Sequence, residues 1–113
     1  MPDYGQYCPI SLASEVVADR WTPLILRELW LGNTRFNDLV RGLPGISRTV
    51  LTQRPSHLER HGVLELWPSP AGRGNEYRLT PAGQDLGSVL ESMGRWAITW
   101  LYDELRPDDV DAQ

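Results

Sequence analysis

The sequence predicts a single domain of the mainly α (α+β) class, and three observations lead to this prediction. Apolar residues recur at three- and four-residue spacing along most of the chain, which is typical of helices packed on one core. Two short stretches after residue 62 instead alternate apolar and polar residues, as strands do. The length of 113 residues, of which 41% are hydrophobic, fits one compact domain, which we expect to cover residues 1–106.

The N-terminal part is expected to contain three helices and one short strand. The first helix covers about residues 10–18, whose apolar residues share one side. Thr22-Pro23 forms an N-cap followed by proline at the first helical position, and Gly32 ends this second helix. The second helix is apolar on most sides and should lie at the centre of the domain. Residues 34–36 are predicted to form a short edge strand, before a short helix at residues 37–41.

A helix-turn-helix is predicted for about residues 36–62. Residues 43–46, Leu-Pro-Gly-Ile, form a turn because adjacent Pro and Gly interrupt both helix and strand. Ser47 then caps a third long helix that runs to about His61 and ends at Gly62. A short helix, a tight turn and a longer polar helix are the outline of this motif.

A β-hairpin is predicted directly after this motif, at residues 63–79. Its strands cover residues 63–67 and 76–79, and a turn-rich loop between them holds Arg73 between two glycines. A hairpin at this position is the wing of a winged helix-turn-helix, with a two- to three-stranded wing sheet. The strand residues expected on the inner face are Leu64, Leu66, Tyr77 and Leu79.

The C-terminal helix is expected to begin at Thr80-Pro81 and to run over residues 81–105, roughly 37 Å at 1.5 Å per residue. Its long apolar stripe fits either the domain core or a dimer interface, and we favour dimerisation through this helix and the N-terminal one. The acidic residues 107–113 are expected to be disordered. The residues expected in the dimer interface are Leu86, Leu90, Met93, Trp96, Ala97, Trp100 and Leu101.

The net charge of −4 conceals a basic centre. Residues 35–78 carry seven Arg against four acidic residues, a local charge of +3, whereas residues 79–113 carry −5. Every basic residue is Arg, which can grip phosphate or guanine with two hydrogen bonds, although a GC-rich genome would also favour arginine codons. Binding to phosphate responds to the local field, so the acidic total does not exclude DNA. Arg35, Arg41 and Arg78 are expected either to contact phosphate or to form surface salt bridges, and the sequence does not distinguish these two roles.

The third long helix presents a polar face opposite Leu51, Pro55 and Leu58. Its Gln, Arg, Thr and Ser side chains are the types that read base edges, and no acidic residue precedes Glu59 on it. The alternative is an ordinary solvated face. Arg73, at the loop tip, can enter a minor groove, contact phosphate, or simply lie in solvent. The residues expected to contact double-stranded DNA are Ser47, Arg48, Thr49, Thr52, Gln53, Arg54, Ser56 and Arg73.

Pro55 conflicts with a regular third helix, because proline in a helix interior removes a backbone hydrogen bond and costs about 3 kcal/mol. We therefore expect this helix either to kink near Thr52 or to end early. A kink would re-aim Thr52, Gln53 and Ser56, so their contacts with bases depend on this residue.

Metal binding and catalysis find little support in the sequence. His57 and His61 have a spacing able to hold Zn²⁺, but no Glu follows His57 as in metalloproteases, so no metal or other cofactor is expected. Without a phosphate loop or a nucleophile–base arrangement, we do not expect an enzyme. The single cysteine, Cys8, cannot form an internal disulfide and is either a small packing residue or a redox-sensing thiol.

A set of short motifs, taken together, points to one family. The motifs are Cys8-Pro9-Ile10, Trp21-Thr22, Leu24-Ile25-Leu26-Arg27-Glu28-Leu29, Arg35-Phe36 with Leu39, Leu43-Pro44-Gly45-Ile46-Ser47, Leu51-Thr52-Gln53-Arg54, Leu58-Glu59 with Gly62, and Glu76-Tyr77-Arg78-Leu79-Thr80 with Gly83. In these the chain resembles the HxlR-type winged helix-turn-helix transcriptional regulators, relatives of the MarR type. The resemblance implies a dimer built from the terminal helices, a recognition helix after Ser47, control of a nearby promoter, and a sensing thiol at Cys8. Pro55 departs from the apolar helix former usual in the family.

The function expected from these observations is that of a cytoplasmic, cofactor-free, sequence-specific DNA-binding regulator. We expect a repressor that binds a palindromic operator as a homodimer and responds to an oxidant, an electrophile or a small-molecule ligand. The alternatives are a winged-helix module for protein–protein contacts without specific DNA binding, and a small-ligand carrier that uses the tryptophan-rich seam. No membrane partner or secretory signal is expected, since no apolar run approaches 18–20 residues and the first residues are neither basic nor continuously apolar.

Overall fold

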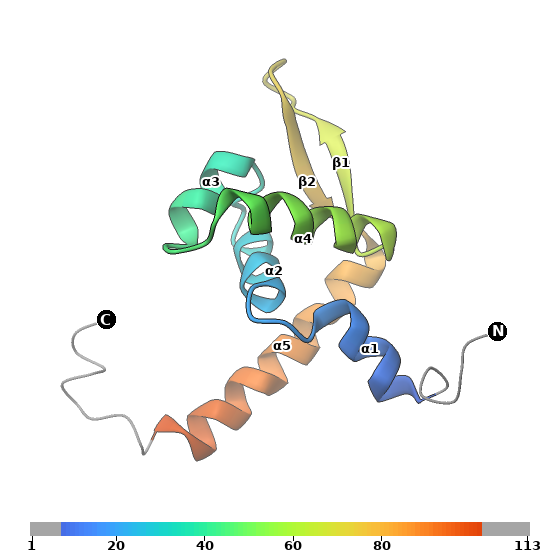
Figure 1. The fold of residues 1–113 in the computed structure, drawn as a ribbon, viewed down its shortest axis with the longest axis vertical. Coiled ribbons are helices and arrows are strands. Elements are labelled where there is room, and N and C mark those ends of the chain that lie inside the picture. Colours follow the sequence, from blue (N-terminus) through green and yellow to red (C-terminus); the bar gives the residue numbers. More distant parts are fainter. Residues whose placement is uncertain (1–7, 103–113) are drawn as a thin grey trace.

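The computed structural model describes residues 8–102, and this part of the chain holds five helices and a two-stranded sheet that projects from one end of the domain (Figure 1). The elements are α1 (Pro9–Val17), α2 (Thr22–Trp30), α3 (Phe36–Gly42), α4 (Arg48–Arg60), β1 (Leu64–Pro68), β2 (Asn75–Leu79) and α5 (Pro81–Trp100). The helix pair α3–α4 is the helix-turn-helix and the hairpin β1–β2 is the wing, so the predicted fold class is confirmed. None of the helices described for residues 8–102 has the length and apolarity needed to cross a membrane.

The C-terminal helix α5 begins at Pro81, as predicted, and runs to Trp100, with Leu101 as its C-cap. The last residues of the predicted helix, 103–105, lie outside the described residues. The expected acidic tail at residues 107–113 lies outside the described residues.

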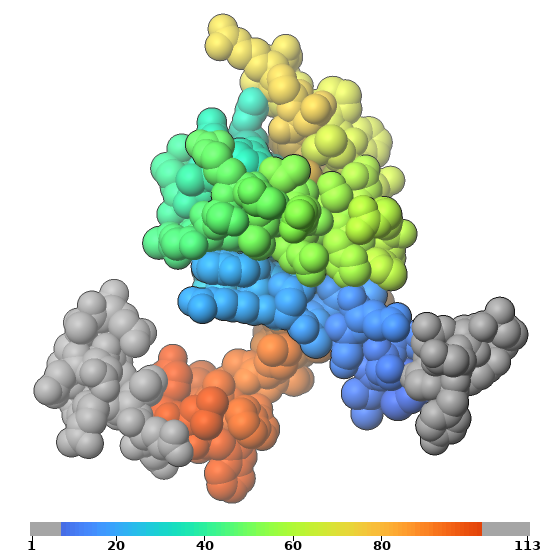
Figure 2. All heavy atoms as spheres, in the orientation of Figure 1, coloured from blue at the N-terminus to red at the C-terminus, as the bar shows by residue number. Residues whose placement is uncertain are grey.

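The core is built around α2, as its apolar sequence predicted. Ile25 and Leu26 are fully buried in a core that also holds residues of α3, α4 and β1, and α5 packs against α2, whereas α1 buries none of its residues. The second half of α5 extends away from the body of the domain, and α1 also lies on its periphery (Figures 1 and 2). The buried hydrophobic residues are Ile25, Leu26, Leu29, Leu39, Leu43, Leu51, Leu58, Val63 and Leu64.

A buried carboxylate joins α2 to α3. Glu28 is only 5% exposed, and its side chain accepts hydrogen bonds from Asn33 Nδ2 at 2.8 Å and from Arg27 Nη2 at 3.0 Å. A Cβ at Gly42 would lie 2.0 Å from Glu28 Oε1, so a larger residue in the last turn of α3 would have to displace this carboxylate.

The wing has two strands rather than three. β1 and β2 pair antiparallel, with Leu64 opposite Leu79 and Leu66 opposite Tyr77. The edge strand predicted at residues 34–36 is absent, because α3 already begins at Phe36; the Thr34 carbonyl accepts one hydrogen bond from Tyr77 N at 2.8 Å. Leu66 was expected to face inward but is 45% exposed, since the hairpin extends beyond the core.

Pro55 does not end α4 early. The helix continues from Arg48 to Arg60 with Pro55 inside it, so the expected early end was wrong (Figure 1). Pro55 is fully buried on the core side of the helix, beside the positions of Leu51 and Leu58. Burial of its apolar ring offsets part of the cost of the backbone hydrogen bond that proline cannot donate.

Candidate nucleic-acid interface

The exposed face of α4 is held in place by its cap and its core side. Ser47 Oγ accepts a hydrogen bond from Val50 N at 3.1 Å and so satisfies one of the free donors of the first turn, as predicted. The core side of α4 is buried, while the expected DNA-facing residues of the opposite face are exposed. These exposed residues are Ser47, Arg48, Thr49, Thr52, Gln53 and Ser56.

Arg48 is oriented by an aromatic ring of the preceding helix. Its guanidinium carbon lies 5.4 Å from the centroid of the Phe36 ring, a cation–π contact between the start of α4 and the start of α3. A shallow hollow on the surface of α4 is lined by the side chains of Arg48, Thr49, Thr52 and Gln53. Four of the predicted contact residues therefore meet at one place.

The hydroxyl groups of this face are partly occupied within the helix. Thr52 Oγ1 donates to the Arg48 carbonyl at 2.8 Å, and Ser56 Oγ donates to the Thr52 carbonyl at 3.2 Å. Each hydroxyl then has lone pairs left to accept a hydrogen bond but no free hydrogen to donate. On this geometry, Thr52 and Ser56 are suited to accept from a base amino group, and Thr52 can also offer its methyl group.

Arg54 lies apart from the other predicted contact residues. Its Nη1 atom lies 3.3 Å from Asp19 Oδ2, a partly buried ion pair between α4 and the turn that precedes α2. Asp19 also accepts hydrogen bonds from Trp21 N, from Thr22 N and from the Thr22 hydroxyl, and the N-cap residue of α2 is Trp21 rather than the predicted Thr22. Partial burial raises the pKa of Asp19, but these hydrogen bonds together hold it below its ordinary value.

Arg73 lies at the tip of the wing, whereas other arginines in and near the wing contact residues of their own domain. Arg73 is exposed between Gly72 and Gly74, whose φ angles are +83° and +61°. Arg41 pairs with Asp38, and Arg78 pairs with Glu76 at 3.0 Å and lies over the Trp67 ring. For Arg35, Arg41 and Arg78 the sequence did not separate phosphate contacts from salt bridges. In the structure Arg41 and Arg78 form ion pairs, while Arg35 contacts the wing loop.

Tyr77 of β2 has a perturbed hydroxyl. Burial, and in addition the negative charge of Glu59, raises the pKa of Tyr77 above its ordinary value.

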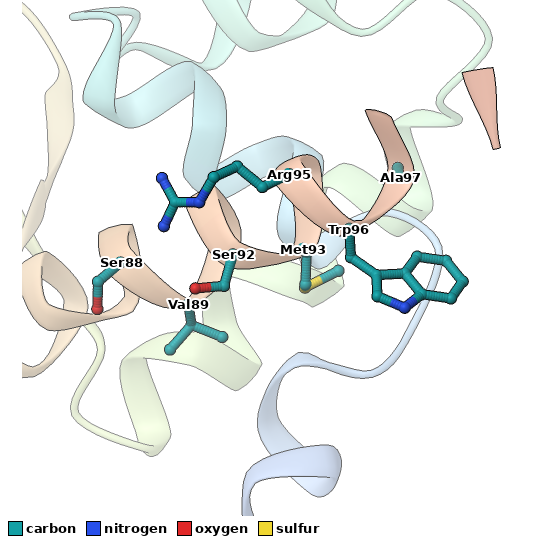
Figure 3. A pocket seen from close by; sticks show the side chains of 7 residues that line it. All are labelled: Ser88, Val89, Ser92, Met93, Arg95, Trp96 and Ala97. Atoms are coloured by element: carbon teal, nitrogen blue, oxygen red, sulfur yellow. The ribbon is translucent and has the colours of Figure 1, made fainter. Parts of the chain in front are cut away.

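The apolar stripe of α5 packs on the domain core in its first half and is exposed in its second half. Leu86 and Leu90 were expected in a dimer interface, but they pack, partly buried, against the core of their own chain. Further along, Met93, Trp96, Trp100 and Leu101 are exposed, and Ala97 is half-buried. Figure 3 shows Val89, Met93 and Trp96 projecting from α5 along one apolar hollow. Further exposed apolar residues were not predicted for this surface; they are Val89 and Ile98 of α5, Tyr102 just beyond it, and Ile10 and Leu12 of α1.

The remaining candidate residues lie near α1. Cys8 is exposed and occupies the N-cap position of α1. His57 Nε2 lies 2.9 Å from the Glu15 carbonyl oxygen, and its ring meets that of His61 edge-on, with centroids 4.6 Å apart. Within residues 8–102, no group of three or more His, Cys, Asp or Glu side chains is placed to hold a metal ion.

A capped polar helix, set in a helix-turn-helix and followed by a wing, defines the class of winged helix-turn-helix transcriptional regulators. The family model described as HxlR-like helix-turn-helix matches residues 16–105. An uncharacterized HTH-type transcriptional regulator of Synechocystis is 36% identical over 102 residues, which cover 88% of this chain and 75% of that protein. The uncharacterized regulator YvaP of Bacillus subtilis is 33% identical over 100 residues, covering 86% and 92% of the two chains. The chain belongs to the HxlR-like helix-turn-helix family.

Solved structures agree with this assignment. The crystal structure of PA1607, assigned as a transcription factor, has a TM-score of 0.81 at 33% identity and covers 89% of this chain and 68% of that chain. The redox regulator HypR in its reduced form has a TM-score of 0.71 at 26% identity, with 81% and 92% covered. Diamide-treated YodB from Bacillus subtilis has a TM-score of 0.66 at 29% identity, with 82% and 94% covered. The protein is therefore a transcriptional regulator of the HxlR and MarR type.

Proposed function

We propose that this regulator binds double-stranded DNA in a sequence-specific manner and represses transcription as a homodimer on a palindromic operator. The observation that carries the proposal is the exposed face of α4, where the residues that line one hollow are Arg48, Thr49, Thr52 and Gln53, none of them acidic. A helix of this kind fits the major groove of B-DNA, which is about 12 Å wide. Because the protein works on the chromosome, the cytoplasm is the expected compartment.

Each side chain of this face has a chemical counterpart on DNA. Arg48 can donate two parallel hydrogen bonds to guanine, and Gln53 can donate to and accept from adenine. The methyl groups of Thr49 and Thr52 suit the thymine methyl. The capped N-terminus of α4, at Ser47, favours a phosphate, and this contact sets the register of the helix on the duplex.

The apolar surface of α5 supports the proposed homodimer. Trp96 and Trp100 are 58% and 65% exposed, and Ile10 of α1 is 77% exposed. Large exposed apolar side chains gathered on two peripheral helices are costly in water, and a second copy of the chain would cover them. The two-fold axis would then place two α4 helices about one turn of DNA apart, roughly 34–36 Å, as a palindrome requires. Bound across a promoter, such a dimer excludes the polymerase.

The proposal is tested by the affinity for DNA from upstream of the protein's own gene. Gln53→Ala should lower the affinity for that DNA about tenfold or more, by loss of a contact with two hydrogen bonds, and leave binding to scrambled DNA unchanged. The matched control is Gln84→Ala, the same change at an exposed position of α5, which should leave both affinities unchanged. A module for protein–protein contacts would instead bind all DNA weakly and with little dependence on salt. Equal affinity of Gln53→Ala and wild type for the upstream DNA would contradict the proposal.

We propose further that oxidants or electrophiles control this DNA binding through Cys8. Its thiol is exposed at the start of α1, one of the two proposed dimer helices. Two of the similar structures, HypR in its reduced form and diamide-treated YodB, are of proteins studied in defined redox states. With one cysteine per chain, diamide can accept two electrons and two protons from two Cys8 thiols and leave one disulfide between two copies.

The redox response is tested by treating the protein with diamide. Non-reducing electrophoresis should show a covalent dimer, operator affinity should change, and dithiothreitol should reverse both effects. Cys8→Ser should bind the operator as wild type does and lose the response. A response retained in Cys8→Ser would overturn the role of this thiol. If wild type itself does not respond to diamide, redox control fails, and a small-molecule ligand would be the effector to seek.

A further inference from the structure

Arg35, the N-cap residue of α3, contacts the wing loop across a long separation in sequence. Its Nη1 atom donates a hydrogen bond to Ser69 Oγ at 2.7 Å, and its Nη2 atom donates to the Arg73 carbonyl oxygen at 2.9 Å. These partners lie 34 and 38 residues further along the chain. A guanidinium presents such donors in a rigid planar fork, so the two bonds fix the loop in two places at once.

The loop that Arg35 contacts is closed on itself. Ser69 N donates to the Gly74 carbonyl, and Gly72 N donates to the Ser69 carbonyl, both at 3.0 Å. Ser69 Oγ also accepts a hydrogen bond from Ala71 N, so this hydroxyl joins the loop backbone to Arg35. Ser69 is only 7% exposed although its neighbours in the loop are exposed. The guanidinium of Arg35 therefore helps to cover Ser69, whose hydrogen bonds close the loop.

The outer half of the hairpin has few other contacts with the rest of the domain. Leu66 and Trp67, at the middle of β1, are 45% and 44% exposed, so the outer half of the wing lies beyond the core. A two-stranded hairpin without a hydrophobic face to pack on is marginally stable in water. Besides strand pairing, the bond from Tyr77 N to the Thr34 carbonyl holds β2, and Arg35 holds the loop. Both contacts come from the segment that leads directly into α3.

We propose that Arg35 is a positioning residue for DNA binding, which fixes the wing tip, and with it Arg73, relative to the helix-turn-helix. This inference rests on the proposed function. A tip ordered before binding loses less conformational freedom when Arg73 meets DNA, so the contact contributes more to affinity. The competing role is a direct phosphate contact by Arg35 itself. Lysine keeps the charge but not the planar fork, so Arg35→Lys separates the two roles.

The first arm of the test needs no DNA. Amide hydrogen exchange of residues 69–75 should be about tenfold faster in Arg35→Lys and in Ser69→Ala than in wild type, because the loop opens locally. Exchange in α4 should stay unchanged in both variants, which shows that the domain remains folded. Arg41→Lys is the matched control, because Arg41 pairs with Asp38 of its own helix. Unchanged exchange at residues 69–75 in both loop variants would overturn the proposal, whether or not the protein binds DNA.

The second arm measures the coupling between Arg35 and Arg73 in operator binding. Arg73→Ala should lower affinity about tenfold in the wild-type background but less than about twofold in the Arg35→Lys background. Independent phosphate contacts would give equal losses in both backgrounds, and that result would overturn the positioning role. If the wild-type protein binds no DNA, the proposed function fails, while the exchange arm still decides whether Arg35 orders the wing.

Discussion

Gly83, in the first turn of α5, lies where this helix passes close to the base of the wing. A Cβ at this position would lie 2.2 Å from the Val63 carbonyl oxygen and 2.9 Å from Leu79 Cδ2. The Val63 carbonyl accepts a hydrogen bond from Thr80 N at 3.0 Å. Because the obstacle is a backbone oxygen, Gly83→Ala forces α5 away from the hairpin base and strains this bond.

The expected effect of Gly83→Ala is a loss of stability, against the ordinary trend in helices. Glycine to alanine in a helix interior normally stabilises by about 0.5–1 kcal/mol. Here the forced displacement strains both hydrogen bonds that the Val63 carbonyl accepts, from Thr80 N and from Thr80 Oγ1, at a cost of about 1–3 kcal/mol, to which the steric strain adds. We therefore expect the free energy of unfolding to fall by about 2 kcal/mol.

Gly87→Ala is the matched control on the same helix. Its Cβ would meet the Trp30 ring at 3.5 Å, an ordinary contact, so we expect stabilisation by about 0.5–1 kcal/mol. Urea unfolding followed by far-UV circular dichroism measures both variants, at one protein concentration because the stability of a homodimer depends on it. A Gly83→Ala variant as stable as wild type would refute the close approach of α5 to Val63.

Three further outcomes are expected. The pKa of Asp19 is lowered in the folded state, so its contribution is present at neutral pH and is lost as pH falls below about 4; Asp19→Asn should flatten that part of an acid-unfolding curve. The pKa of Tyr77 is raised, so stability is complete below about pH 10 and falls above it; Tyr77→Phe should weaken this alkaline loss in the same assay. Trp96 is 58% exposed, so Trp96→Glu should yield a folded monomer in sedimentation velocity, whereas an unchanged dimer would place the interface elsewhere.

The sequence predicted the fold well because helical periodicity records burial. Leu51, Pro55 and Leu58 were assigned to the core side of α4 from their spacing, and all three are fully buried. Ser47 was predicted as the cap of this helix, and its hydroxyl does accept the hydrogen bond. Both features depend on residues close in sequence, where local patterns are informative.

Features that depend on tertiary contacts were not predicted. Alternation in β1 indicates which face Leu66 occupies but not that the core ends before it. Leu86 and Met93 belong to one stripe, yet Leu86 packs on its own domain and Met93 is exposed, because α5 leaves the body of the domain between them. Arg54 meets an acid 35 residues earlier in the chain, and no local pattern distinguishes it from Gln53.

The most direct measurement of the central claim is a hydroxyl-radical footprint on the DNA upstream of the protein's own gene. If two copies of α4 read a palindrome, the footprint will show two protected regions related by two-fold symmetry, with centres about one helical turn apart. The same DNA with Gln53→Ala should need a higher protein concentration for the same protection. Uniform protection of any DNA sequence, or a footprint that Gln53→Ala leaves unchanged, would contradict the assignment of the exposed face of α4 as the reading surface.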